Sequence, residues 1–394
     1  MISQIRCVIM RGGTSKAVFL KEGDLPVDEH ERIRTILAVF GSPDRRQIDG
    51  LGGADPLTSK LAIIGPVRTD EPRAAHTHLT YTFGQVEITH PEIDWLSLCG
   101  NISSAVGAFA IYEGYVTANE PVTQVRVFNT NLSRVLTIEV PVKDGRPLEQ
   151  GSYSVPGVPG TGAKILIDFS DTAGAATGAL LPTGRPVDRL NVPDVGEIDV
   201  SLVDIGNAHV FVRASDLGLR GTEGAAQLDA DHELRARLER IRGAAAQRMG
   251  MIVDAARSRE ESPATPILGI VSPPASYRDE NGGSMVNEDE VDLVSRLMFM
   301  QQTHKTYAGT STVCTGVASR LTGTLVHEVT RLQTRRADTV RIGHPAGVIE
   351  TETQVEKDGS NGYVVRRATL GRTARRIMEG YVFVPEMAPV AGDH

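Results

Sequence analysis

The chain has 394 residues, of which 40% are apolar, 23% charged and 5% aromatic, and its formal net charge is -8. This length exceeds what one ordinary hydrophobic core supports, so we expect two domains. The acidic balance, with no basic block to offset it, argues against a general nucleic-acid binder. An anionic substrate would therefore have to be attracted by a local site, because the overall field of the protein repels it.

The cysteines and the hydropathy pattern indicate the compartment. Cys7, Cys99 and Cys314 are an odd number without a CxxC pair, so we expect neither a disulfide framework nor a structural zinc site. The first residues read as a strand and a turn rather than as a signal peptide, and no run of about 18 apolar residues predicts a transmembrane helix. We therefore expect a cytoplasmic protein without a membrane partner.

In the first half, short apolar and alternating runs separated by glycine-rich turns predict a sheet of short strands. We expect a helix over residues 29–40, ended by a Gly-Ser-Pro turn. A glycine-rich loop at 49–56 leads to Lys60 and then to the apolar run 61–64. The other strands of this half are expected over residues 7–10, 17–20, 79–89, 122–142 and 163–169.

The most informative segment of this half is 102–113, which is small and apolar on nearly every face. A helix without a polar face is a buried helix. Because short strands surround it in the sequence, we expect a curled sheet wrapped around this helix. Its first turn would begin at Cys99, Gly100 and Asn101.

The second half repeats this pattern without obvious sequence identity. Strands are expected over 198–204 and 210–213, peripheral helices over 229–249 and 287–304, and a second buried small-residue helix over 309–319. We place the domain boundary so that the domains are 1–183 and 184–394, with a last strand that could return to the first domain. Two such halves favour a pseudo-twofold arrangement around a cleft, although two unrelated Ala/Gly-rich core helices would give the same pattern.

Cys99 is the first candidate for chemistry, because the helix dipole and free N–H groups stabilise a thiolate at a helix N-terminus. Gly100, which follows it, permits close approach of a ligand to the backbone. Cys314 lies deeper in its predicted helix, and Cys7 lies in an apolar strand. For these two cysteines a small buried apolar residue is the stronger interpretation.

Lys60 is the second candidate, since a lysine that leads into a buried strand loses solvation, which favours the neutral amine and makes it a usable base. The alternative is a strand-end lysine whose ammonium reaches water. His209 and His344 lie in tight turns, and their spacing matches no zinc motif, so we predict no metal site. Either histidine could orient a substrate or be held structurally by hydrogen bonds.

The glycine-rich loops are the third feature. The segment 11–16 ends in lysine but lacks the spacing of a phosphate-binding loop, and no GxGxxG opens a strand–helix–strand unit, so nucleotide sites are unsupported. Backbone N–H groups and hydroxyls of such loops bind carboxylates as readily as phosphates. The candidate substrate contacts are Gly13, Thr14, Ser15, Gly100, Asn101, Ile102, Gly309, Thr310, Ser311 and Thr312, and the further candidates are Cys314, His344, Asn207 and His209.

Five motifs taken together resemble one known family. They are MRGGTSK, QIDGLGGADPLTSK, CGN before the buried helix, IGHPAG and RTARRIMEGYV. The chain is similar, over almost its whole length, to the family of methylaconitate cis-trans isomerase, methylitaconate delta-isomerase and 4-oxalomesaconate tautomerase. The segments DFSDTAGAATG, VDLVSRLMFMQ and HKTYAGTSTVCTG look most similar to the methylitaconate branch of that family.

The resemblance implies an α+β, diaminopimelate epimerase-like fold, in which two pseudo-symmetric domains each curl a mixed sheet around a central helix. It implies Lys60 and Cys99 as the proton-transfer pair, and Ser15 and the segment 310–312 as contacts to substrate carboxylates. It also implies that no cofactor is needed. In the related epimerases a second cysteine faces the first, and Cys314 occupies a comparable motif, so its role stays open.

The expected function is a cofactor-independent isomerase that moves a C=C bond in a small unsaturated di- or tricarboxylate, most closely of the methylitaconate-to-dimethylmaleate type. 2-Methylaconitate cis-trans isomerisation and 4-oxalomesaconate tautomerisation are the alternatives within the family. A cysteine-pair amino-acid epimerase and a non-catalytic carboxylate-binding accessory protein are the alternatives outside it. The expected partner is a small-molecule acid, and no nucleic-acid partner is expected. The sequence leaves open whether further copies of the chain form a homo-oligomer.

Overall fold

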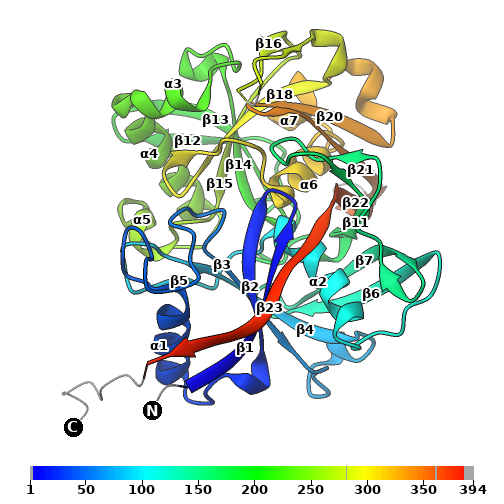
Figure 1. Cartoon of the computed structure of the whole chain (residues 1–394). Helices are drawn as coiled ribbons and strands as arrows, with labels where there is room; N and C mark the ends of the chain where they lie inside the picture. The colour runs from blue at the N-terminus through cyan, green and yellow to red at the C-terminus, as the bar shows by residue number, and fades with distance from the viewer. Residues whose placement is uncertain (1–2, 281, 360–361, 386–394) are drawn as a thin grey trace.

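A continuous curved sheet runs through the whole protein. The computed structural model describes residues 3–280, 282–359 and 362–385. Within these residues 19 strands join in one sheet, and two small two-stranded sheets lie outside it. Figure 1 shows the sheet folded into a lower and an upper half, each of which surrounds one helix.

The lower half curls around helix α2 (Gly100–Tyr112), whose residues 100–111 are all buried. Its strands pair in the spatial order β1, β2, β3, β4, β6, β7, β11, with parallel pairs at β2–β3 and β4–β6. The strands of this half are β1 (Ser3–Gly12), β2 (Ser15–Lys21), β3 (Lys60–Gly65), β4 (Leu79–Val86), β5 (Ile93–Asp94), β6 (Val122–Asn129), β7 (Arg134–Lys143), β8 (Arg146–Pro147), β9 (Tyr153–Ser154), β10 (Thr161–Gly162) and β11 (Ile165–Asp168).

The upper half curls in the same way around helix α6 (Gly309–Ala318), which is buried along its whole length. Its strands pair in the order β12, β13, β14, β15, β18, β20, β21, β22, with parallel pairs at β14–β15 and β18–β20. The strands are β12 (Asp188–Val192), β13 (Gly196–Ile205), β14 (Asn207–Arg213), β15 (Ile267–Ser272), β16 (Tyr277–Arg278), β17 (Met285–Val286), β18 (Leu293–Phe299), β19 (Gln302–Thr303), β20 (Thr339–His344), β21 (Gly347–Asp358) and β22 (Gly362–Arg372).

Two strands join the halves. β11 pairs with β7 of the lower half on one side and with β22 of the upper half on the other. The last strand, β23 (Ala374–Val384), leaves the upper half and pairs antiparallel with β1, from Gly12 opposite Ala374 to Ser3 opposite Val384. The domain boundary predicted after residue 183 lies in the connection between β11 and β12.

Peripheral helices cover the outer faces of the sheet. α1 (Glu29–Phe40) packs in an apolar cluster with strands of the lower half, and α4 (His232–Arg248) packs in another with β12 to β15. The remaining helices are α3 (Ala225–Ala230), α5 (Ser258–Glu261) and α7 (Leu325–Val329). In the described part of the chain, no helix combines the length and the apolar character that a membrane crossing requires.

One predicted element is wrong. The expected helix over 287–304 is a short 3-10 turn at Glu288–Glu290 followed by β18 and β19. β18 lies between β15 and β20, and all but its last residue is buried, so its side chains show no polar alternation. A short, fully buried run cannot be assigned to helix or strand from periodicity alone.

The other main elements agree with expectation. The helix expected over 29–40 is α1, and the two small-residue helices are α2 and α6. The helix expected over 229–249 is interrupted at Asp231, whose side chain caps α4 by accepting a hydrogen bond from Leu234 N. The strand expected over 122–142 is the hairpin β6–β7.

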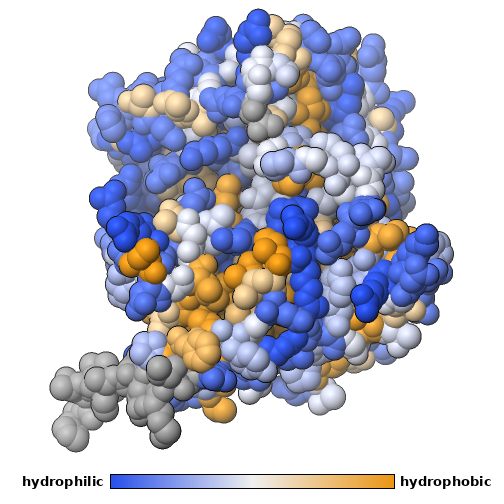
Figure 2. Space-filling model, in the orientation of Figure 1, coloured by the Kyte–Doolittle hydropathy of each residue, from blue (hydrophilic) through white to orange (hydrophobic). Residues whose placement is uncertain are grey.

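The outer edge of β23 is apolar. Among the described residues β23 pairs with β1 alone, and it exposes Ile377, Met378, Tyr381 and Phe383. Figure 2 shows hydrophobic residues gathered over the lower part of this face, where β1 and β23 run in Figure 1, whereas the upper part is mostly hydrophilic.

Candidate active site

The two central helices meet at their N-termini. A Cβ atom built on Gly100 would lie 3.0 Å from Thr310 N, and one built on Gly309 would lie 3.1 Å from Gly100 C. These contacts are tighter than most that a Cβ atom makes, so glycine at both positions lets the two backbones approach this closely without displacing each other. The first turns of α2 and α6, which come from different halves, are thereby brought together.

A cavity of about 440 Å³ opens where these helix ends meet. It takes residues from both halves of the protein and from the loops that lead into the two helices. Its lining residues are Ser15, Leu57, Lys60, Phe83, Ser97, Leu98, Cys99, Gly100, Asn101, Asn207, Ile267, Phe299, His304, Ala308, Gly309 and Thr310.

The two central helices lack the side-chain caps that α1, α4 and α7 have. Side-chain oxygens of Asp28, Asp231 and Thr324 cap α1, α4 and α7. In contrast, Cys99 and Ala308 occupy the N-cap positions of α2 and α6 without a side-chain cap, and neither helix has an acidic residue in its first turn. The N–H groups of a helix N-terminus that no side chain satisfies are suited to bind an anion.

Lys60 begins β3 and is only 5% exposed. Its Nζ donates to Gln85 Oε1 at 2.5 Å and lies 5.2 Å from the centre of the Phe83 ring. Gln85 is held in turn, because its Nε2 donates to the carbonyl oxygens of Pro56 and Ser59. Lys60 has no ion pair with any described residue, so its ammonium would face the cavity without a protein counter-charge.

Cys99 is half-buried at the start of α2, and its carbonyl oxygen accepts from both N and Oγ of Ser103. The residue before it is tied to the other half of the protein. Asn207 Oδ1 accepts from Leu98 N, and Asn207 Nδ2 donates to Leu98 O and to Thr310 Oγ1, each at 3.1 Å. Asn207 therefore fixes the position of Cys99 relative to α6.

Arg372, which the sequence analysis did not select, lies behind the start of α2. It is 2% exposed, and its Nε donates to Asn101 Oδ1 at 2.7 Å. The pKa of Arg372 is lowered to about 10, because the lowering by burial exceeds the raising by the charges of Tyr153 and Cys99. No described carboxylate forms an ion pair with it, so Arg372 adds a second uncompensated positive charge near the cavity.

The glycine turn between β1 and β2 supports the same helix end. Thr14 Oγ1 accepts from Asn101 Nδ2 at 3.0 Å. Gly13 has a φ of 49° and a Cβ there would lie 2.2 Å from Asn101 Oδ1. Neither residue lines the cavity, whereas Ser15 does: it is 2% exposed, and its hydroxyl has no hydrogen-bond partner among the described residues. That hydroxyl is free to bind a ligand.

His304 lines the cavity and was missed from the sequence, although the motif HKTYAGT begins with it. The pKa of His304 is lowered to about 4, mainly by burial and to a smaller extent by the positive charges of Lys60 and Arg372. Its Nδ1 accepts from Thr306 N at 3.2 Å. The neutral ring therefore carries its proton on Nε2, where it can donate to a ligand.

His209 and Ser311 bind each other instead of lining the cavity. His209 Nδ1 donates to Asn207 O at 2.8 Å, and its Nε2 accepts from Ser311 Oγ at 2.7 Å. Burial lowers the pKa of His209 to about 4, so this neutral arrangement persists at physiological pH. Thr312 Oγ1 donates to Ala308 O within α6.

His344 and Ile102 are also buried outside the cavity. Burial, followed by the charges of Arg296 and Arg372, holds the pKa of His344 well below its usual value. Its Nδ1 accepts from Ala346 N, and its Nε2 has no partner among the described residues. His344 thus lies behind the site as a neutral residue.

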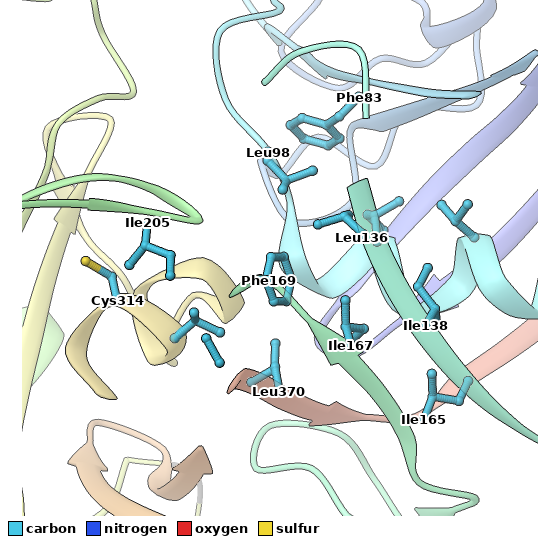
Figure 3. Close-up of a cluster of buried hydrophobic side chains, with 14 of the residues drawn as sticks. Phe83, Leu98, Leu136, Ile138, Ile165, Ile167, Phe169, Ile205, Cys314 and Leu370 are labelled. Carbon is cyan, nitrogen blue, oxygen red and sulfur yellow. The ribbon is translucent and has the colours of Figure 1, made fainter. Parts of the chain in front are cut away.

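Cys314 does not face Cys99. It is the sixth residue of α6 and fully buried, and Figure 3 shows its sulfur beside Ile205 in the apolar core. Burial raises the pKa of Cys314 well above its usual value, and Asp204 raises it further. The residue of α6 that corresponds to Cys99 is Ala308, which carries no thiol. A pair of thiols across the cavity is therefore not present.

The described residues include no group of three or more His, Cys, Asp or Glu side chains that could hold a metal ion. The groups that line the cavity are instead an amine, a thiol, hydroxyls, amides and a neutral imidazole. Such a set can bind carboxylates and transfer protons.

A model of one protein family, described as PrpF protein, matches residues 2–385 of the chain. The chain belongs to the PrpF family. It is 53% identical over 97% of both chains to a protein of Eubacterium barkeri named 3-methylitaconate isomerase. It is 37% identical, again over 97% of both chains, to a protein of Shewanella oneidensis named 2-methyl-aconitate isomerase.

Solved structures agree with this assignment to the PrpF family. The structure of a methylitaconate-delta-isomerase matches with a TM-score of 0.83 and 51% identity, covering 100% of this chain and 99% of that one. A hydroxyproline epimerase of Agrobacterium vitis matches with a TM-score of 0.56 at 11% identity, over 98% of this chain and 93% of that one, which shows the fold alone. The family resemblance, the α+β epimerase-like fold and the enzyme class, an isomerase, are thereby confirmed.

Proposed function

We propose that this PrpF-family isomerase moves a C=C bond in a small unsaturated dicarboxylate by 1,3-proton transfer between Lys60, Cys99 and the substrate. Conversion of methylitaconate to dimethylmaleate is the proposed type of reaction, and it needs no organic cofactor. The observation that carries the proposal is the buried Lys60 ammonium, which has no described carboxylate partner, in one cavity with Cys99 and two uncapped helix N-termini.

Charge explains why the substrate is an anion with two carboxylates. A buried cation without a protein partner is costly, so a bound anion would stabilise it. The uncapped N-termini of α2 and α6 each offer backbone N–H groups at the same cavity. We assign one carboxylate to each helix end, with Ser15 Oγ and His304 Nε2 as additional donors.

The proton transfer follows from this placement. One of the two groups, Lys60 or Cys99, removes the proton from the carbon between the methyl and carboxylate groups of methylitaconate. The electron pair delocalises into the C=C bond and its carboxylate, and a proton returns at the terminal CH₂ carbon, which becomes a methyl group. Negative charge gathers on carboxylate oxygen in the intermediate, where one preorganised donor contributes about 3–4 kcal/mol.

Apolar residues complete the cavity on one side. Phe83, Leu98 and Ile267 are buried and line it together with the partly buried Phe299. An apolar wall suits the methyl and alkene carbons of the substrate and keeps water from quenching the carbanionic intermediate.

The test is deuterium incorporation. The protein is incubated in deuterated water with methylitaconate, 2-methylaconitate or oxalomesaconate, and the products are followed by NMR. We expect rearrangement of methylitaconate with one solvent deuterium in the new methyl group. If none of the three acids rearranges or exchanges, the proposal fails.

Variants assign the roles. Lys60→Ala should lower kcat by about 10²–10⁴-fold while thermal unfolding stays close to wild type. Lys164→Ala, which removes a half-exposed lysine outside the cavity, serves as the control and should retain activity. Full activity of Lys60→Ala would remove Lys60 from the mechanism.

The alternatives outside the family predict other outcomes. A cysteine-pair epimerase would need a second thiol at the cavity, where α6 places Ala308. A non-catalytic carboxylate-binding protein would bind the acids without exchanging deuterium. 2-Methylaconitate and oxalomesaconate remain the alternative substrates, and relative kcat/KM values decide among the three.

A further inference from the structure

A second, wider cleft, open to solvent, borders the active-site cavity. It is lined by Leu57, Gly157, Ala225, Ala226, Asp229, Glu280, Lys305, Thr306 and Ala346. Leu57 lines both spaces, and Thr306 N donates to His304 Nδ1 of the inner cavity. We call this wider cleft the mouth, because it adjoins the inner cavity and is open to solvent.

The sign of the charge reverses between the two spaces. The inner cavity is lined by Lys60 and by no carboxylate, and Arg372 lies behind it. The mouth is lined by the carboxylates of Asp229 and Glu280 and by a single cation, Lys305. An acid that enters therefore passes from a net acidic region into a positive one.

A hydrogen bond holds one carboxylate of the mouth, because Asp229 Oδ1 accepts from Thr303 N at 2.8 Å. The backbone of Glu280 is fixed by its N–H, which donates to Pro345 O at 2.7 Å. The exposed Glu280 carboxylate lies beside Gly224, where a Cβ atom would be 2.1 Å from Oε1. Both charges can act on a group that projects out of the inner cavity.

We propose that Asp229 and Glu280 select for acids with two carboxylates and against acids with three. This inference rests on the proposed function, since it presumes that the inner cavity binds an unsaturated acid. We assign one carboxylate to each helix N-terminus, and Phe83, Leu98 and Ile267 give the inner cavity an apolar wall. A third carboxylate that projects into the mouth would be repelled by two like charges and attracted by Lys305 alone.

The experiment compares kcat/KM for trans-2-methylaconitate, a tricarboxylate, with kcat/KM for methylitaconate, a dicarboxylate. The variants are Asp229→Asn and Glu280→Gln, alone and combined. Each removes the negative charge and keeps the size of the side chain and its carbonyl oxygen as an acceptor. We expect the double variant to raise the tricarboxylate-to-dicarboxylate ratio about tenfold or more. Glu29→Gln, at an exposed acid of α1 far from the mouth, is the matched control and should keep the wild-type ratio.

Two further measurements depend on the same charges. Lys305→Gln should change the ratio in the opposite direction, because it leaves the two carboxylates of the mouth unopposed. Raising the salt concentration from about 0.05 M to about 0.5 M should raise the wild-type ratio, since salt screens exposed charges, and should affect the double variant less. An unchanged ratio in the double variant, or a wild-type preference for the tricarboxylate, overturns the inference and leaves the isomerase proposal intact.

A binding measurement tests the same selection if the protein turns over none of the acids. Cys99 lines the inner cavity, so a bound acid should protect it from alkylation by iodoacetamide. Protection by methylsuccinate and by tricarballylate is compared in wild type and in the double variant. Stronger protection by tricarballylate in the double variant supports the selection, whereas equal protection in both proteins overturns it.

Discussion

The N-terminal ends of α2 and α6 occupy similar places in the two halves but differ in chemistry. The N-cap residue of α2 is the half-buried thiol Cys99, whereas that of α6 is Ala308, and the thiol of α6, Cys314, lies six residues further on, inside the core. Both ends leave their N–H groups uncapped towards the same cavity. Binding is thus shared by the two halves, while the proton-transferring groups come from one half alone.

The difference between the two N-cap side chains shows which features the two halves share and which they do not. Each half retains the buried small-residue helix inside a curled sheet, and with it the backbone donors at the helix end. The side chain at the N-cap is not needed to hold the helix in place, so it can differ between the halves. The predictions below test this division between shared binding and one-sided chemistry, from the largest expected effect to the smallest.

The paired variants Cys99→Ala and Cys314→Ala test the difference most directly. We expect Cys99→Ala to lower kcat by about 10²–10⁴-fold, because a group that transfers a proton is lost. Cys314→Ala should retain kcat and lower the free energy of unfolding by about 1 kcal/mol, because it leaves a small gap in the core. Steady-state kinetics and chemical denaturation measure both. A comparable loss of kcat in Cys314→Ala would contradict the one-sided assignment.

Gly309→Ala tests the junction of the two helix ends. The new methyl group would lie 2.6 Å from Leu370 Cδ2 and 3.1 Å from Gly100 C, so the ends must move apart. We expect a stability loss of about 1–3 kcal/mol and a raised KM, since both carboxylate sites shift. Gly316→Ala, whose methyl group would meet Thr351 Cγ2 at 2.4 Å in the same helix, should lower stability with KM unchanged. Equal KM values in the two variants would refute a special role for the junction.

The pH dependence of stability should reveal the bond between His209 and Ser311 on the α6 side. The pKa of His209 is about 4 in the folded protein, against a usual value of 6.5. Between these pH values the unfolded chain binds a proton that the folded protein does not, so stability falls as the pH decreases. His209→Gln should reduce this slope by about 1.4 kcal/mol per pH unit.

The matched control for that measurement is His30→Gln, at an exposed position of α1, which should keep the wild-type slope. Urea denaturation at several pH values between 4 and 6.5 gives the slopes directly. Identical slopes for wild type and His209→Gln would show that His209 is not held neutral.

Ala308→Ser gives α6 a side-chain cap of the kind that α1, α4 and α7 have. A serine at this position should stabilise the protein by about 1 kcal/mol, because its hydroxyl satisfies a free N–H group of the first turn. The same hydroxyl competes with the substrate carboxylate, so we expect KM to rise. Asp231→Ala, which removes the cap of α4, should lower stability without changing KM. A stabilised variant with unchanged KM would show that the substrate does not use the end of α6.

The sequence predicted the parts of the fold that local pattern determines. The small-residue segments predicted α2 and α6, and the helix expected over 29–40, ended by the Gly-Ser-Pro turn, is α1 with the observed bounds. β18 was predicted as a helix, because neighbouring strands bury it on both faces and remove the alternation by which a strand is recognised.

Site residues were predictable from the sequence where their immediate neighbours mark them, such as a glycine-rich loop or the start of a helix. Lys60, Cys99 and Ser15 adjoin glycine-rich loops or a helix start, and all three line the cavity. His304 and Arg372 carry no such signal. They lie near the cavity only because β19 and β22 bring distant parts of the chain beside α2, and a contact of that kind depends on tertiary structure rather than on neighbouring residues.

The pairing of β1 with β23 has a consequence for how the protein is made. Because Ser3 lies opposite Val384, the sheet of the first half lacks its outermost strand until nearly the whole chain has left the ribosome. Until then β1 presents an open edge, to which strands of other nascent chains could add. The first half therefore completes its sheet only when the last strand arrives.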